Sequence, residues 1–204
     1  MIDAVTALAS LKEGNARFVS GLRSIDKLLS HSQRMEYISG QEPFAIILGC
    51  SDSRVPAEIV FDQGLGDLFV IRVAGNIVAP SQVGSVEFAA EQFNTRLVVV
   101  MGHTHCGAVK ATLDEMHSPG PEHSKNIQSI VNRIRPSLEP FVHTDLWGKY
   151  DELFKHATHA NIIASVNQLK HSSKILEDLI EKDDLVIVGA EYDLHTGKVE
   201  FFED

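Results

Sequence analysis

The chain has 204 residues and a formal net charge of −10, with 28 acidic and 18 basic side chains. This length suits one domain with a substantial hydrophobic core. The negative charge argues against a general affinity for nucleic acid or for an anionic membrane surface. No stretch approaches the ~20 apolar residues of a membrane span, and the N-terminus lacks the apolar core of a signal peptide. We therefore expect a single domain over residues 1–204, located in the cytoplasm.

The segment before the first predicted strand, up to about Gly40, is expected to be helical. Val5, Leu8, Leu11 and Phe18 recur at spacings that give a helix an apolar face. Such a helical arm could pack on its own sheet or on a partner subunit. The periodicity does not decide between these two placements.

Four short runs of Val, Ile and Leu are predicted to be strands of a parallel sheet. They lack polar alternation, which is typical of strands that helices cover on both faces. The runs are "FAIIL" (44–48), "LFVIRV" (68–73), "LVVVM" (97–101) and "LVIVGA" (185–190). Because helical segments lie between them, we predict an α/β fold with a mostly parallel four-stranded sheet flanked by helices. The closing "KVEFF" after the turn "HTG" could add an antiparallel edge strand.

Helices are predicted between the strands from the spacing of apolar residues. They are expected at residues 81–94, 107–117, 124–142 and 151–182. Pro136 is expected to kink or end the third of these helices. In the last one, apolar residues recur every three or four positions over the whole stretch.

The two cysteines of the chain each follow closely on a predicted strand. Ligands of parallel sheets bind beyond the carboxyl ends of the strands. We therefore expect Cys50 to meet His103 and Cys106 if the first and third strands are neighbours. Two Cys and one His form a zinc site whose fourth position stays open for water or substrate. The alternative, a disulfide between the cysteines, is disfavoured in a reducing compartment.

Two charged residues follow Cys50 at positions 52 and 54. Asp52 can accept a hydrogen bond from a water or hydroxide on the zinc ion. Arg54 can hold Asp52 as a carboxylate through a charge-assisted contact. A purely structural zinc ion would not require this pair, so we predict a catalytic site.

These residues resemble the zinc signature of the β-class carbonic anhydrases. The similar segments are "CSDSR" (50–54), "VPAEIVFDQGLGDLFVIRVAGN" (55–76), "HTHC" (103–106) and the closing "LVIVGAEYDLHTGKV" (185–199). The resemblance implies that Cys50, His103 and Cys106 bind one zinc ion per subunit, with Asp52 and Arg54 as the catalytic dyad. It implies reversible hydration of CO2 to bicarbonate and a proton by zinc-bound hydroxide.

The resemblance also implies a substrate pocket. Gln41 would help to bind substrate, and Phe69, Ala74 and Phe88 would line a narrow apolar pocket for CO2. Another type of the family binds inhibitory bicarbonate with a Trp at the position of Ile47. The chain therefore resembles the type with an active-site Gln and no inhibitory-site Trp.

The resemblance leaves the resting state of the site open. In an open form Asp52 pairs with Arg54, and this form is favoured at neutral pH. In a closed form Asp52 leaves Arg54 and becomes the fourth zinc ligand. The resemblance further implies a homodimer or a dimer of dimers, with the arm of residues 1–40 packing on a partner subunit.

Two other functions remain as alternatives to CO2 hydration. The same scaffold could act on another small linear substrate such as carbon disulfide. The chain could also be a non-catalytic zinc protein that senses redox state through Cys50 and Cys106.

Overall fold

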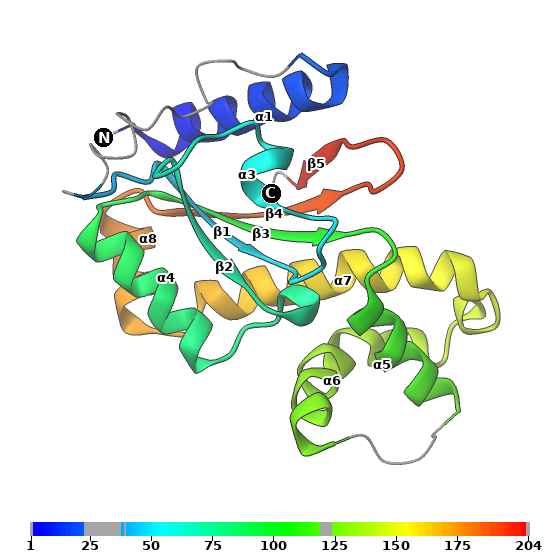
Figure 1. The fold of residues 1–204 in the computed structure, drawn as a ribbon. Coiled ribbons are helices and arrows are strands. Elements are labelled where there is room, and N and C mark those ends of the chain that lie inside the picture. Colours follow the sequence, from blue (N-terminus) through cyan, green and yellow to red (C-terminus); the bar gives the residue numbers. More distant parts are fainter. Residues whose placement is uncertain (1, 23–37, 39, 119–123, 203–204) are drawn as a thin grey trace.

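The computed structural model describes residues 2–22, 38, 40–118 and 124–202. A five-stranded sheet lies at its centre, with the strand order β2-β1-β3-β4-β5 (Figure 1). The strands are β1 (Ala45–Gly49), β2 (Leu68–Arg72), β3 (Leu97–His103), β4 (Val186–Tyr192) and β5 (Val199–Phe202). The first four are parallel, and β5 pairs with β4 in the antiparallel sense. The predicted sheet and its antiparallel edge strand are therefore confirmed.

Burial on both faces explains why the strand sequences lack polar alternation. Every residue of β1 and β3 is buried. Ile47 and Val99 face one hydrophobic core, whereas their neighbours Ile46 and Val98 face the other. Successive side chains of a strand point to opposite faces, so a strand between two cores needs an apolar residue at every position.

Helices form a layer on each face of the sheet (Figure 1). The helices are α1 (Ala4–Ser20), α3 (Ala57–Val60), α4 (Pro80–Gln92), α5 (Gly107–His117), α6 (Lys125–Leu138), α7 (Tyr150–Lys170) and α8 (Lys174–Lys182), with 3-10 turns η3 (Ala74–Asn76), η4 (Glu139–Phe141) and η5 (Asp145–Gly148). Side chains of α1 and α3 pack in one core, and those of α4, α7 and α8 pack in the other. Helices α5 and α6 pack against the first half of α7, in a third cluster that includes both cysteines. None of the described helices is long and apolar enough to span a membrane.

The prediction of one helical stretch over residues 151–182 is wrong. The chain leaves the helix after Lys170 and starts α8 at Lys174. Ser173 begins the new helix, because its side-chain oxygen accepts the backbone N–H of Leu176 at 3.1 Å. Helix α6 passes Pro136 by two residues and then tightens into η4, so its end lies close to the predicted one.

Helix α1 is attached to the body of its own chain. Asp3 caps its start by accepting the N–H of Thr6 at 2.8 Å. Leu11 is buried in the core beneath α1, but Val5 is 79% exposed and does not belong to the predicted apolar face. Residues 23–37 and 39, the rest of the predicted helical arm, lie outside the described residues.

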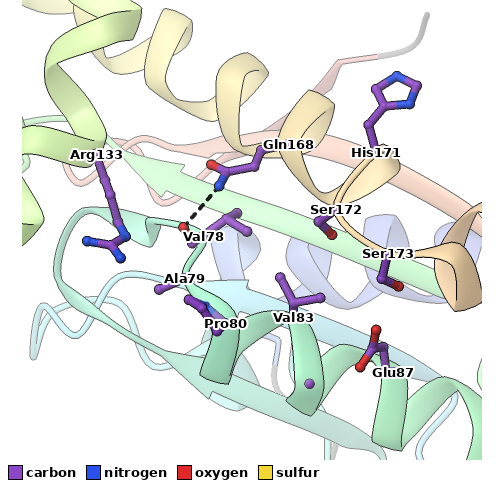
Figure 2. Close-up of a pocket in the computed structure, with 11 residues that line it drawn as sticks. Val78, Ala79, Pro80, Val83, Glu87, Arg133, Gln168, His171, Ser172 and Ser173 are labelled. Carbon is purple, nitrogen blue, oxygen red and sulfur yellow. Dashed lines mark hydrogen bonds between the residues drawn. The ribbon is translucent and has the colours of Figure 1, made fainter.

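Helices α4 and α7 leave a hollow of about 620 Å³ between them (Figure 2). Gln168 of α7 closes one side of it by donating from Nε2 to the carbonyl oxygen of Val78 at 3.3 Å. Arg133 of α6 and Glu87 of α4 also line the hollow. None of the candidate site residues lines this hollow.

Candidate metal centre

Cys50, His103 and Cys106 meet at the carboxyl edge of the sheet, because β1 and β3 are neighbours. Cys50 directly follows β1, His103 is the last residue of β3, and Cys106 is the N-cap of α5. One possible ligand atom from each residue lies within 4.8 Å of the others. The exposed fractions of the three residues are 5%, 0% and 1%. The geometry therefore offers a buried set of two sulfur atoms and one nitrogen atom.

The spacing of these atoms fits a tetrahedral ion such as zinc. Zinc–sulfur bonds of about 2.3 Å place two sulfur ligands about 3.8 Å apart. The sulfur atoms of Cys50 and Cys106 are 4.0 Å apart, and both thiols are free. His103 Nδ1 lies 2.8 Å from the carbonyl oxygen of Thr104, which can only accept, so Nδ1 carries the proton. His103 Nε2 is buried with no hydrogen-bond partner among the described residues, as a metal-binding nitrogen requires.

A hydrogen bond between the two sulfur atoms, which are 4.0 Å apart, affects both thiols. Their hydrogen bond lowers the pKa of Cys50, and the same hydrogen bond together with burial raises the pKa of Cys106. Cys50 is therefore the more readily ionised of the two thiols. A divalent cation that binds both sulfur atoms as thiolates displaces their protons.

Arg54 holds Asp52 in a two-pronged ion pair beside the candidate ligands. Arg54 donates from Nε to Oδ1 at 2.9 Å and from Nη2 to Oδ2 at 2.7 Å. These hydrogen bonds hold the pKa of the Asp52 carboxyl well below its ordinary value. Oδ2 of Asp52 also lies 3.8 Å from Nε2 of His103. The carboxylate thus faces Arg54 while it borders the metal centre, which is the arrangement expected of an open site.

Contacts with backbone groups also support the candidate ligands. No sequence pattern indicated these contacts. The N–H of Gly75 lies 3.4 Å from the sulfur of Cys50. Arg72 donates to the carbonyl oxygens of Cys50 and Asp52, at 3.0 and 2.5 Å. The glycine itself, three residues after the end of β2, is the one local signal that points to such a contact.

The predicted substrate residues divide into two groups. Ala74 lies in η3, directly before Gly75 and close to Cys50. Phe69 instead packs against Phe88 of α4, with ring centres 6.2 Å apart, three positions before the carboxyl end of β2. Gln41 is exposed and precedes β1, whereas Cys50 follows β1. The five residues of β1, with a rise of about 3.3 Å per residue, therefore lie between them. Gln41, Phe69 and Phe88 therefore do not reach the metal centre of their own chain.

Comparisons with known proteins place the chain in a family. The family model described as carbonic anhydrase matches residues 45–199. The chain belongs to the carbonic anhydrase family. It is 40% identical to a carbonic anhydrase of Mycolicibacterium smegmatis, over 96% of this chain and 92% of the relative. It is 39% identical to carbonic anhydrase 2 of Mycobacterium tuberculosis, over 95% of this chain and 90% of the relative.

Solved structures place the carbonic anhydrase fold of the chain in the β class. The β-carbonic anhydrase CcaA superposes with a TM-score of 0.71 and 25% identity, over 96% of this chain and 95% of that one. A tetrameric β-carbonic anhydrase of Sordaria macrospora gives a TM-score of 0.73 at 20% identity, over 84% and 86% of the two chains. The predicted family and fold are therefore confirmed.

Proposed function

We propose that this carbonic anhydrase hydrates CO2 reversibly at the site formed by Cys50, His103 and Cys106, with zinc as its metal. The observation that carries the proposal is the Asp52–Arg54 ion pair beside three converging ligand atoms. A structural zinc site has four protein ligands and needs no such pair. The relatives, all named carbonic anhydrases, do not favour carbon disulfide or a non-catalytic redox role.

The metal and the protein contribute different parts of the reaction. Bound zinc acts as a Lewis acid that brings the pKa of water toward neutrality, so that a nucleophile exists at physiological pH. Asp52 stays ionised because Arg54 donates to both of its oxygens. An ionised carboxylate can only accept a hydrogen bond, so a hydroxyl group beside it turns its proton toward Asp52. With its proton held by Asp52, such a group would keep a lone pair free for attack on CO2.

A second subunit is proposed to complete the substrate pocket. Phe69 of the edge strand β2 packs against Phe88, and Gln41 precedes β1, so all three lie away from the cysteines of their own chain. Phe88 is 51% exposed, and an exposed aromatic ring beside an edge strand suits a subunit contact. The Sordaria macrospora enzymes are described as tetrameric. We extend this to a homodimer or a dimer of dimers, in which the partner supplies these three residues. The arm of residues 1–40, whose Leu11 packs in the core of its own chain, would contact the partner with its exposed side.

A cytoplasmic location is proposed from the chemistry of the cysteines. Their sulfur atoms lie 4.0 Å apart and must both be reduced to bind a metal. In an oxidising compartment, two neighbouring thiols are prone to form a disulfide.

The test combines metal analysis with stopped-flow measurement of CO2 hydration. We expect the purified chain to contain about one zinc ion per subunit and to hydrate CO2. His103→Ala should lose both the zinc and the activity, because a buried ligand is removed. His171→Ala is the matched control, since His171 is exposed and lies outside the site.

Two results would contradict the proposal. A wild-type protein with full zinc occupancy and no CO2 hydration would refute the function. Activity in His103→Ala without bound metal would refute the ligand assignment.

A further inference from the structure

A buried amide on α7 contacts the turn that supports Cys50. Asn161 is 2% exposed, and its Nδ2 donates to the carbonyl oxygen of Gly75 at 2.9 Å. The N–H of the same glycine lies 3.4 Å from the sulfur of Cys50. Asn161 therefore connects to a candidate metal ligand through one residue, although it lies 86 positions from Gly75 in the chain.

The turn at Gly75 needs tertiary contacts to hold its shape. Gly75 has φ 69° and Asn76 has φ 44°, so two consecutive residues adopt left-handed backbone conformations. For a residue other than glycine this conformation costs free energy, and it persists only where the surroundings enforce it. The hydrogen bond from Asn161 is one contact that fixes this backbone.

Packing fixes Gly75 as well. A Cβ atom at Gly75 would lie 2.7 Å from Cδ1 of Ile134 and 3.0 Å from Cβ of Ala108. Helices α5 and α6 thus confine the turn by contact, and α7 holds its carbonyl oxygen by the hydrogen bond from Asn161. Neither sequence spacing nor the ligand pattern assigns Asn161 to the metal centre.

We propose that Asn161 is a positioning residue of the metal centre. Its side-chain amide holds the turn at Gly75 so that the backbone N–H of Gly75 stays on the sulfur of Cys50. This inference rests on the proposed metal-binding function. A hydrogen bond to a ligating sulfur withdraws electron density from it and fixes its direction. When the amide is lost, the turn relaxes and the N–H leaves the sulfur. The sulfur then becomes more electron-rich, which shifts its absorption on a bound metal, and the metal is bound less tightly because Cys50 is no longer held in position.

The experiment uses cobalt as the metal probe in Asn161→Leu. Leucine keeps a similar volume but has no donor for the carbonyl oxygen of Gly75. We expect competition with a chelator to give a cobalt affinity at least about tenfold weaker than that of the wild type. We also expect a shift of the sulfur-to-cobalt charge-transfer band, which a change in overall stability alone would not produce. Asn167→Leu, at an exposed position of the same helix, should change neither quantity.

A second variant and a second measurement cover the case in which Asn161→Leu does not fold. Asn161→Ser is smaller and leaves the same carbonyl oxygen without the amide donor, and it should shift the same band. In the wild type loaded with cadmium-113, NMR should detect coupling between the metal and the amide proton of Gly75 through the sulfur.

The two proposals fail in different ways. A folded Asn161 variant with wild-type cobalt affinity and an unshifted band would overturn the positioning role alone. Absence of the cadmium coupling in the loaded wild type would also overturn it. A wild type that binds neither cobalt nor cadmium would overturn the metal centre itself.

Discussion

A single substitution at Asp52 can remove the charge of the side chain while keeping its size and position. Asp52→Asn preserves the size of the side chain but replaces one accepting oxygen with a donating amide. The metal ligands remain, so the zinc content should stay at the wild-type level. The rate of CO2 hydration should fall by about 100-fold or more, because the fixed acceptor beside the metal is gone.

Stopped-flow kinetics and metal analysis of the same Asp52→Asn sample check this expectation. Asp178→Asn is the control, since Asp178 pairs with Lys174 and Lys182 on the surface of α8. Wild-type turnover in a zinc-loaded Asp52→Asn protein would show that Asp52 has no catalytic role.

The convergence of the three candidate ligands could be predicted from the sequence because each one follows or ends a strand. Cys50, His103 and Cys106 needed only the rule that ligands gather at the carboxyl edge of a parallel sheet. Gly75 and Asn161 could not be predicted in the same way. Each of their contacts joins a side chain to a backbone group of a segment far away in the chain, and such hydrogen bonds leave no periodicity or spacing in the sequence.

At the scale of secondary-structure elements, a single glycine sets the distance between α1 and α3. A Cβ atom at Gly14 would lie 1.8 Å from the carbonyl oxygen of Phe61, so α1 must move when any side chain is added. We expect Gly14→Ala to lower the free energy of unfolding by roughly 1–3 kcal/mol, as is usual for overpacking.

Gly84→Ala is the matched control for this prediction. Gly84 lies within α4 with nothing within 4 Å of an added Cβ atom. Alanine there should raise the stability by about 0.5–1 kcal/mol through its better helix propensity. Urea unfolding of both variants measures the difference, and a Gly14→Ala protein as stable as Gly84→Ala would contradict the close packing of α1.

The elements differ in how well the sequence predicts them. The strands are clear because burial on both faces demands uninterrupted apolar runs, and β1 to β4 all lie within two residues of the predicted bounds. The break between α7 and α8 is not clear, since apolar residues continue at helical spacing on both sides of it. It depends on the hydrogen bond of Ser173 to one backbone N–H, which a hydrophobic pattern cannot indicate.

At the scale of the whole molecule, three of the predicted substrate residues lie far from the metal centre of the same chain. Gln41 and Phe69 lie toward the amino end of the strands, and Cys50 lies beyond the carboxyl end. No motion within a packed sheet can bring these ends together. Either these residues serve another role or they act on the metal centre of a neighbouring subunit.

A mixed dimer distinguishes these two possibilities. One chain carries His103→Ala and lacks a metal, and the other carries Gln41→Ala and lacks the pocket glutamine. If the pocket is shared, each mixed dimer has one site that combines the intact metal centre of one chain with the intact Gln41 of the other. Mixed dimers purified through two different tags should then show about half of the wild-type activity, since one site of two is intact in a twofold-symmetric dimer. If Gln41 served the metal centre of its own chain, the mixed dimer would contain no intact site, and its activity would not exceed half of that of the Gln41→Ala homodimer.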